Sequence, residues 1–396
     1  MLESKLRIIT FVSFYLPGFK AGGPIRTIEN MVSHFADDFE FWIVTRDREK
    51  GAGDPYRKVA IDDWNTVGNA KVFYSSKQNQ TLQAIARLLR ETPHDMLYLN
   101  SFFDFRFSGL PLIANRLQLG QKKPCLIAPR GEFSPGALLL KKTKKRLYLF
   151  LTKNLGLYKD LSWQASSLLE ADDIRREFGV QACSIYIAPD LPSLMHHSDR
   201  SDHAQLRDGK EPLSIIFLSR ISQMKNLDYL LRVLSMVSFP TNLSIYGPIE
   251  SKEFWFFCLD IIRAMPSHIS VSYHGALEPD KVHDALRSHD LFVLPTRGEN
   301  FGHAILESLI AGTPVLISDK TPWRADDEGG VTTLPLDDVG RWVVEINKWA
   351  ELSKSSGLAR RNAARRIAGN ILRNRDIVNQ NKYVFEEVSA RCRTTR

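Results

Sequence analysis

Two glutamates eight positions apart, Glu299 and Glu307, are the residues whose spacing first suggests chemistry. They lie in the stretch TRGENFGHAILE, which follows the apolar run DLFVLP. This pattern predicts a strand, a polar loop, and then a helix over FGHAILESLIAG that ends at Gly312. Eight helical residues rise about 12 Å, so the two carboxylates cannot easily bind one atom. They can contact the two ends of an extended ligand.

The predicted helix N-terminus lies between the two glutamates. Its amide N–H groups, assigned to Asn300, Phe301 and Gly302, suit an anionic or hydroxyl-rich ligand because a helix leaves its first amides without an internal partner. Two glutamates at this spacing are also common by chance, and solvated helix charges are the alternative interpretation.

Two basic residues follow another predicted strand. Arg220 comes directly after LSIIFLS, and Lys225 precedes Asn226, which we predict to be the N-cap of the next helix. Two cations beside a helix N-terminus can stabilise a diphosphate that gains negative charge as it departs. Considered alone, the pair could equally be solvated surface charge.

A pair of glycines follows the first predicted strand. Gly22 and Gly23 precede Pro24, which is well placed at the start of a helix. Such glycines let backbone N–H groups approach a phosphate closely, although a tight structural turn is the alternative. The spacing differs from GxGxxG, which counts against a dehydrogenase.

The order of these motifs resembles that of the retaining glycosyltransferases of the GT-B fold, and in particular glycosyltransferase family 4. GENFGHAILE has the family's E-x7-E pattern, Arg220 and Lys225 its R-x4-K pattern, and the glycine pair its GG loop. The segments PRGEFSPG, SSLLEADD and TPWRADDEGG are also similar to family segments. The resemblance therefore covers nearly the whole chain.

The resemblance implies a ligand cleft between two domains and assigns roles to single residues. Glu299 would contact the donor sugar and Glu307 the ribose, with Arg220 and Lys225 beside the diphosphate as catalytic cations. The glycine pair would also face the diphosphate. The implied reaction retains the configuration of the sugar, uses a nucleoside-diphosphate sugar as donor, and needs no metal or other cofactor.

One position departs from the family pattern. Many members carry a His after the fourth strand, where this chain has Asn100 and Ser101. An Asn can hydrogen-bond a sugar hydroxyl or a phosphate but carries no charge. Asp104, Arg106 and Arg130 lie on neighbouring predicted loops and could bind an acceptor or a phosphate, or could be structural.

Apolar runs of strand length alternate with helical patterns along all 396 residues. This alternation predicts an α/β fold with parallel sheets covered on both faces. We predict two doubly wound, Rossmann-like domains, and the resemblance implies that the first lies on the acceptor side and the second binds the nucleotide sugar. Their predicted bounds are 1–190 and 212–372, with a linker at 191–211 and a final helix in 373–396 that crosses back to the first domain.

The net charge of +8 predicts an anionic partner. The first residues read as a strand rather than a signal peptide, and no apolar run is long enough to span a bilayer, so we expect a cytoplasmic protein. The basic stretch 139–151 could lie on an anionic membrane or could be a helix with a solvated cationic face. The four cysteines have no CxxC spacing, so neither zinc nor a disulfide framework is expected.

Family members often extend lipid-linked saccharides. We therefore expect a hexosyltransferase that acts on a saccharide or lipid-linked acceptor in the biosynthesis of a surface polysaccharide, lipopolysaccharide or other glycolipid. A sugar-nucleotide epimerase of the same fold is the first alternative. A nucleic-acid-binding protein is less favoured, because no recognisable nucleic-acid-binding motif accompanies the positive charge.

Overall fold

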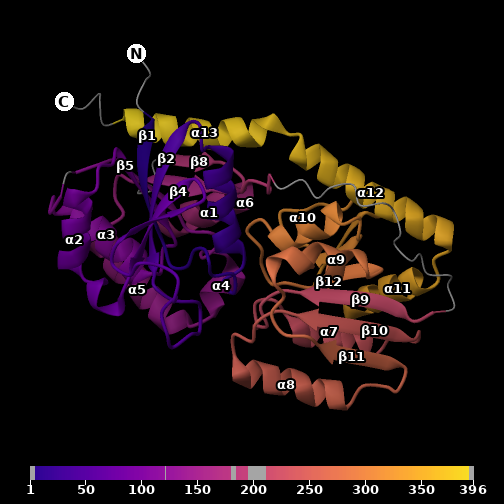
Figure 1. The fold of residues 1–396 in the computed structure, drawn as a ribbon. Helices are drawn as coiled ribbons and strands as arrows, with labels where there is room; N and C mark the ends of the chain where they lie inside the picture. The colour runs from indigo at the N-terminus through magenta and orange to yellow at the C-terminus, as the bar shows by residue number, and fades with distance from the viewer. Residues whose placement is uncertain (1–4, 121, 180–183, 195–210, 392–396) are drawn as a thin grey trace. The chain divides into compact units, whose positions relative to one another are not determined.

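The computed structural model describes residues 5–120, 122–179, 184–194 and 211–391. The chain divides into two compact units (Figure 1). Unit 1 comprises residues 1–194 and 375–396, and unit 2 comprises residues 195–374. The chain therefore passes from unit 1 to unit 2 after residue 194, within the predicted linker 191–211. Most of that linker lies outside the described residues. The chain returns to unit 1 at residue 375, two residues after the predicted start of the final segment.

Unit 1 contains, within its described residues, an eight-stranded sheet in the order β3-β4-β2-β1-β5-β6-β7-β8. All neighbouring strands are parallel except β3 and β4. The strands are β1 (Leu6–Val12), β2 (Phe39–Arg46), β3 (Trp64–Val67), β4 (Ala70–Ser75), β5 (Met96–Asn100), β6 (Cys125–Ala128), β7 (Ser162–Ala165) and β8 (Ser184–Ile187).

The helices of unit 1 form two layers over this sheet, and each layer has its own apolar core. The longer helices are α1 (Gly23–His34), α2 (Leu82–Glu91), α3 (Leu110–Arg116), α4 (Pro135–Leu139), α5 (Lys142–Asn154), α6 (Leu168–Phe178) and α13 (Arg375–Ala390). Two short helical turns, η1 (Lys77–Asn79) and η2 (Phe105–Gly109), follow β4 and β5.

Helix α13 belongs to unit 1 although it follows unit 2 in the chain. Its Phe385 is fully buried and meets the rings of Phe39 and Tyr98 edge-on, at centroid distances of 5.5 and 5.2 Å. Asn381 accepts a hydrogen bond from Gln164 and donates one to the carbonyl of Pro189. These contacts fix α13 against the sheet of unit 1.

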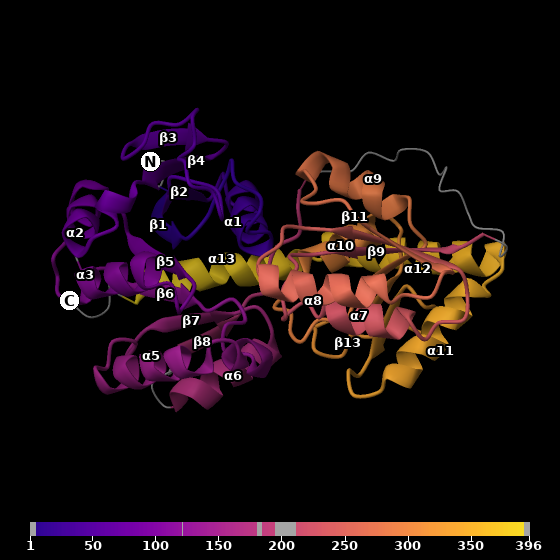
Figure 2. The same ribbon diagram turned by 90° about the horizontal axis from the view of Figure 1, so that it is seen from below.

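Unit 2 contains, in the part of the chain that is described, a six-stranded parallel sheet in the order β11-β10-β9-β12-β13-β14. Its strands are β9 (Leu213–Leu218), β10 (Thr241–Tyr246), β11 (Ile269–Tyr273), β12 (Leu291–Leu294), β13 (Val315–Ser318) and β14 (Val331–Leu334). Its helices are α7 (Leu227–Leu234), α8 (Lys252–Arg263), α9 (Val282–Arg287), α10 (His303–Ile310), α11 (Val339–Ala350) and α12 (Lys354–Leu372), with the short turn η4 (Pro279–Lys281) before α9 (Figure 2).

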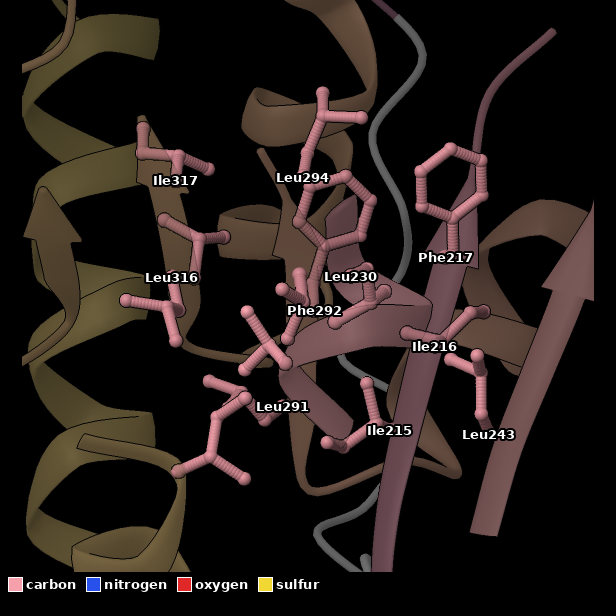
Figure 3. Close-up of a cluster of buried hydrophobic side chains, with 14 of the residues drawn as sticks. Ile215, Ile216, Phe217, Leu230, Leu243, Leu291, Phe292, Leu294, Leu316 and Ile317 are labelled. Carbon is pink, nitrogen blue, oxygen red and sulfur yellow. The ribbon is translucent and has the colours of Figure 1, made fainter. Parts of the chain in front are cut away.

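The centre of unit 2 is a continuous apolar core around β9, β12 and β13 (Figure 3). Ile215, Phe292 and Leu316, one from each strand, are all fully buried. Side chains on both faces of these strands are buried, as expected of a parallel sheet covered by helices on both faces. The strands therefore form a rigid base for the loops at their carboxyl ends. Both sheets show the predicted α/β architecture.

The cysteines agree with the sequence where they are described. Cys125 and Cys258 are free and buried, and burial raises the pKa of each thiol to about 12. Both therefore stay protonated at neutral pH, as packing residues do. Cys183 and Cys392 lie outside the described residues.

Candidate functional site

The residues singled out from the sequence lie at the carboxyl end of a parallel strand, on the loop after it, or on the helix that follows. In unit 2 these loops follow β9, β12 and β13, and in unit 1 they follow β1, β5 and β6. Ligands of open parallel sheets bind at this edge, because loops and helix N-termini gather there.

In unit 2, hydrogen bonds join the loop after β9 to the loop after β12. The backbone carbonyl of Met224 accepts from the Arg297 amide at 2.8 Å and from the Thr296 hydroxyl at 3.2 Å. The Arg297 guanidinium also donates to the side-chain oxygen of Asn226 at 3.0 Å. Because β9 and β12 are neighbouring strands, these bonds hold the two loops as one rigid frame.

Lys225 and Glu299 form an ion pair across this frame. Their side chains are only 11% and 13% exposed, so the pair is largely removed from water. The structure therefore brings together two residues that the sequence had assigned to different parts of a ligand. A pair in such surroundings orients both groups, and removing one partner leaves the other charge buried.

Arg220 lies on the same loop as Lys225 but has a different partner. Its guanidinium donates to both carboxylate oxygens of Glu250, at 2.9 and 2.8 Å, on the loop after β10. Both side chains are about one-third exposed. Both cations that the sequence assigned to a diphosphate are thus held in position by a carboxylate.

Asn226 precedes α7 as predicted, but it does not cap the helix in the expected way. Its backbone has a positive φ of 61°, and its side chain forms no bond to the first turn of α7. The side-chain oxygen instead accepts from Arg297. Asn226 therefore joins loops rather than capping a helix, because asparagine tolerates the left-handed conformation that this turn requires.

Helix α10 begins two residues later than predicted, at His303. Gly302 is its N-cap with φ 86°, a conformation that cannot continue a right-handed helix. A Cβ at Gly302 would also come within 2.7 Å of the Ile305 side chain, so the position requires glycine. Asn300 and Phe301 consequently lie in the loop, and the first helical amides belong to later residues. Glu307 occupies the second turn, as predicted.

Trp323, in the TPW segment after β13, fixes the loop before α10. Its indole Nε1 donates to the Phe301 carbonyl at 2.6 Å, and the two rings are 6.0 Å apart. The amide of Glu299 also donates to the Lys320 carbonyl at 3.1 Å. The segment after β13 therefore holds the loop that carries Glu299, a role that the TPW motif alone did not reveal.

In unit 1, Gly22 lies immediately before α1 with φ 70°, and α1 begins at Gly23. No atom lies within 4 Å of the place where a Cβ of Gly22 would be. Its backbone conformation, rather than lack of space, therefore favours glycine here. The glycine pair ends a loop at a helix N-terminus, as predicted, with Pro24 in the first turn.

Asn100 and Arg130 contact each other in a buried network of unit 1. The Asn100 oxygen accepts from Arg130 at 3.2 and 2.9 Å, and Arg130 pairs with Asp190 at 2.5 Å. Asn100 is only 7% exposed, yet its Nδ2 has no acceptor within the described part of the chain. An unsatisfied buried donor costs about 1–3 kcal/mol, so this amide is a candidate contact for a ligand.

Asp104 has a more structural environment. One carboxylate oxygen accepts from the amides of Arg106 and Phe107, and the other accepts from Ser13 and Arg46. These four bonds use the acceptor capacity of a carboxylate. Asp104 therefore holds the turn η2 in place beside β1 and β2.

Sequence reasoning missed a buried carboxylate, Glu132, in the PRGEF segment. It accepts hydrogen bonds from the Ser101 hydroxyl and from the amides of Phe102 and Phe103, and burial raises its pKa. Glu132 thereby fixes the loop that follows Asn100. Its place directly after the PRG motif is the signal that could have identified it.

Among the described residues, no three His, Cys, Asp or Glu side chains gather in a group that could hold a metal ion. No described helix has both the length and the apolar character needed to cross a bilayer.

Comparisons with known proteins agree with this fold. HepE from Anabaena, solved in complex with UDP and glucose, superposes with a TM-score of 0.69 over 97% of this chain and 100% of its own, at 14% identity. At that identity the likeness shows the fold alone. The molecule is thus an α/β protein of the GT-B fold, with two Rossmann-like domains.

Two curated proteins are similar to this chain in sequence. An uncharacterized 41.2 kDa protein in the cps region of Klebsiella pneumoniae is 23% identical over 76% of this chain and 81% of its own length. A D-inositol 3-phosphate glycosyltransferase of Xylanimonas cellulosilytica is 27% identical over 48% of this chain, and the match spans 46% of that protein. This chain thus covers about half the length of the second relative.

Residues 198–354 match the family model described as glycosyl transferases group 1. This segment carries Arg220, Lys225, Glu299 and Glu307. The predicted resemblance to group 1 glycosyltransferases is therefore confirmed.

The Lys225–Glu299 pair predicts a specific pattern of stability. We expect Lys225→Met to lower the free energy of unfolding by about 3–5 kcal/mol, because Glu299 is then left buried and unpaired. The double variant Lys225→Met, Glu299→Gln should regain part of that loss. Chemical denaturation of Lys225→Met, Glu299→Gln, the double variant and the parent chain measures this, and single-variant losses that simply add in the double variant would contradict the coupling.

Proposed function

We propose that this protein is a retaining hexosyltransferase that moves a sugar from a nucleoside-diphosphate sugar to a saccharide or lipid-linked acceptor. The observation that carries the proposal is the frame of unit 2, in which the Lys225–Glu299 pair lies where the loops after β9 and β12 meet, before α10 with its Glu307. A frame of fixed charges beside helix N-termini suits a ligand with a diphosphate between two groups rich in hydroxyls.

Each residue of this frame has a role in the proposal. Glu299 accepts hydrogen bonds from hydroxyls of the donor sugar, and Glu307 accepts them from the ribose. Lys225 and Arg220 stabilise the diphosphate, and the loop of Asn300, Phe301 and Gly302 contributes amides at the start of α10. The carboxylate partners keep both cations in position before the ligand arrives, so little reorganisation is required during reaction.

The proposed step breaks the bond between the anomeric carbon and the phosphate oxygen, and the bonding electrons leave with the phosphate. The acceptor hydroxyl forms the new bond on the same face of the sugar and passes its proton to the departing phosphate oxygen. Protein cations and helix N-termini stabilise the negative charge that develops. The step as proposed requires no metal and no further cofactor.

Unit 1 contributes polar groups that we assign to phosphate or acceptor oxygens. The amides after Gly22 and Gly23 suit a phosphate, because glycine leaves the backbone exposed. The unsatisfied Nδ2 of Asn100 suits a hydroxyl or phosphate oxygen, with Arg130 holding the amide in that orientation. Asp104 contributes to the acceptor side indirectly, because it holds the turn η2 in place.

The comparisons support parts of this proposal. HepE was solved with UDP and glucose, which favours a uridine nucleotide as donor here. The Klebsiella relative is encoded in a cps region, which favours a surface polysaccharide or glycolipid, including lipopolysaccharide, as the product.

A panel of UDP- and GDP-sugars tests the donor site through binding and slow hydrolysis. We expect one donor to bind, and Glu307→Ala to weaken it roughly 10- to 100-fold, because two hydrogen bonds from ribose hydroxyls to a charged group are lost. Glu351→Ala is the matched control, since Glu351 is exposed in the same unit. Absence of any donor binding, or equal affinities for both variants, would show that the assignment is wrong. Products formed without acceptor would distinguish an epimerase.

We also propose that unit 1 associates with an anionic membrane surface from the cytoplasmic side. Residues 133–159 contain seven Lys or Arg and no Asp or Glu. Helices α4 and α5 and the residue after α5 expose five large apolar side chains, from 48% to 78%, while Leu149 and Thr152 pack inward. We call these five the basic apolar surface: Leu139, Leu147, Phe150, Leu151 and Leu155. Apolar side chains flanked by cations suit the interface of an anionic bilayer.

Sedimentation with vesicles tests this surface. We expect binding to vesicles that contain phosphatidylglycerol, weaker binding at high salt, and little binding to phosphatidylcholine alone. The variant Phe150→Gln, Leu151→Gln should weaken binding at least tenfold, because burial of each side chain contributes about 1.5–3 kcal/mol. Leu117→Gln, at another exposed leucine of unit 1, is the control. Equal binding to both lipids would exclude the proposed charge recognition.

A further inference from the structure

Two arginines of unit 1 converge on a single neutral oxygen. Arg46 is the last residue of β2, and Arg106 lies in η2 after β5. The guanidinium of Arg46 donates to Oε1 of Gln80 at 3.3 Å, and that of Arg106 donates to the same atom at 3.1 Å. Two like charges therefore lie within a few ångströms of each other at the carboxyl edge of the sheet.

The Gln80 amide is fixed in the orientation that holds the two arginines. Gln80 is only 7% exposed, and its Nε2 donates to the Ser75 carbonyl at 3.0 Å. Its oxygen must therefore face the guanidinium groups. A buried glutamine fixed in this way positions two cations without neutralising either.

The cluster contains one carboxylate for two guanidinium groups. Asp104 pairs with Arg46 at 2.8 Å, and its other bonds go to backbone amides and to the Ser13 hydroxyl. No carboxylate of the described residues pairs with Arg106, whose side chain is exposed. One positive charge of the cluster therefore has no carboxylate partner among the described residues.

Arg46 also has a donor that no protein group uses. Its guanidinium lies over the rings of Phe14 and Phe107, at 5.6 and 4.8 Å from their centroids. Its Nε is buried, and no acceptor for it exists within the residues that the structure describes. The cluster therefore has both excess charge and an unsatisfied hydrogen-bond donor, and an added anion would compensate both.

The position of the cluster in the sheet also favours a ligand. Its residues follow β1, β2, β4 and β5, which are adjacent in the order β4-β2-β1-β5. The chain leaves β1 in one direction to form β2 and later returns to form β5 on its other side. Open parallel sheets bind ligands beyond their carboxyl ends at such a reversal of strand order.

We propose that Arg46 and Arg106 bind an oxyanion, a phosphate or a carboxylate, that is carried by the acceptor. Planar guanidinium groups match both anions through paired hydrogen bonds. The assignment of this anion to the acceptor rests on the proposed function, in which unit 2 binds the nucleotide. The binding of an anion by Arg46 and Arg106 does not depend on the proposed function. The acceptor class is therefore an anionic saccharide or a saccharide phosphate.

Isothermal titration of the whole chain tests the site with two probes, methyl phosphate and glucuronate, each in the presence of excess UDP. The probe that binds identifies the anion as phosphate or carboxylate. We expect Arg106→Gln to weaken binding roughly tenfold, through loss of a charge-assisted contact, while the amide of the new side chain can still reach Gln80. Arg87→Gln, at an exposed arginine of α2, removes the same charge from the same unit and should change nothing.

Gln80→Glu is a second variant that is nearly isosteric. It places a carboxylate between the two arginines, so we expect loss of binding of the probe that the parent chain binds, together with a higher melting temperature. Failure of both probes to bind the parent chain, or binding by Gln80→Glu equal to that of the parent, would overturn the proposal. Equal affinities of Arg106→Gln and Arg87→Gln for the probe would also overturn the proposal. A UDP titration of the same variants reports separately on the donor site, so failure of the proposed function is recognisable by itself.

Discussion

The buried ion pair between Lys225 and Glu299 joins the loops that follow two neighbouring strands, and the candidate site of unit 2 depends on it. The strands are parallel, so both loops emerge at the same edge of the sheet and can be linked directly. Hydrogen bonds from Thr296 and Arg297 to Met224 support the link. The segment around Trp323 then fixes the other end of the loop before α10. Each charged group is consequently held by neighbours that come from the rigid base of the sheet.

Ion pairs between a cation and a carboxylate also occur at other loops of the protein. Each of four cations at the carboxyl edges of the sheets has one carboxylate partner: Arg220 with Glu250, Lys225 with Glu299, Arg46 with Asp104, and Arg130 with Asp190. The carboxylates restrict the motion of the cations and reduce their net charge. The proposed transfer would use such fixed groups to stabilise a departing diphosphate without first rearranging the site. Arg106 differs, since it shares a neutral oxygen with Arg46, and this difference supports the anion site of unit 1.

The sequence predicted the features that depend on local pattern. Apolar runs identified most strands of both sheets, because periodicity is a property of consecutive residues. The short strands β3 and β14 were not predicted. The Gly22–Gly23 pair identified the loop before α1. The start of α10 was placed two residues early, because the left-handed conformation of Gly302 that sets the helix start does not show in the sequence pattern. Asn226 was assigned to a helix cap, whereas it bonds to Arg297 from a distant loop. Contacts between residues more than 70 positions apart, such as Lys225 with Glu299, do not show in a single sequence.

Hydrogen–deuterium exchange with and without a bound nucleoside diphosphate tests the central claim most directly, because amides near the ligand exchange more slowly when the ligand holds their loop. We expect protection in unit 2 at residues 219–226 and 296–307, which carry Lys225, Glu299 and Glu307. Protection that is confined to other segments, or an unchanged pattern in the presence of a nucleotide shown to bind, would contradict the account.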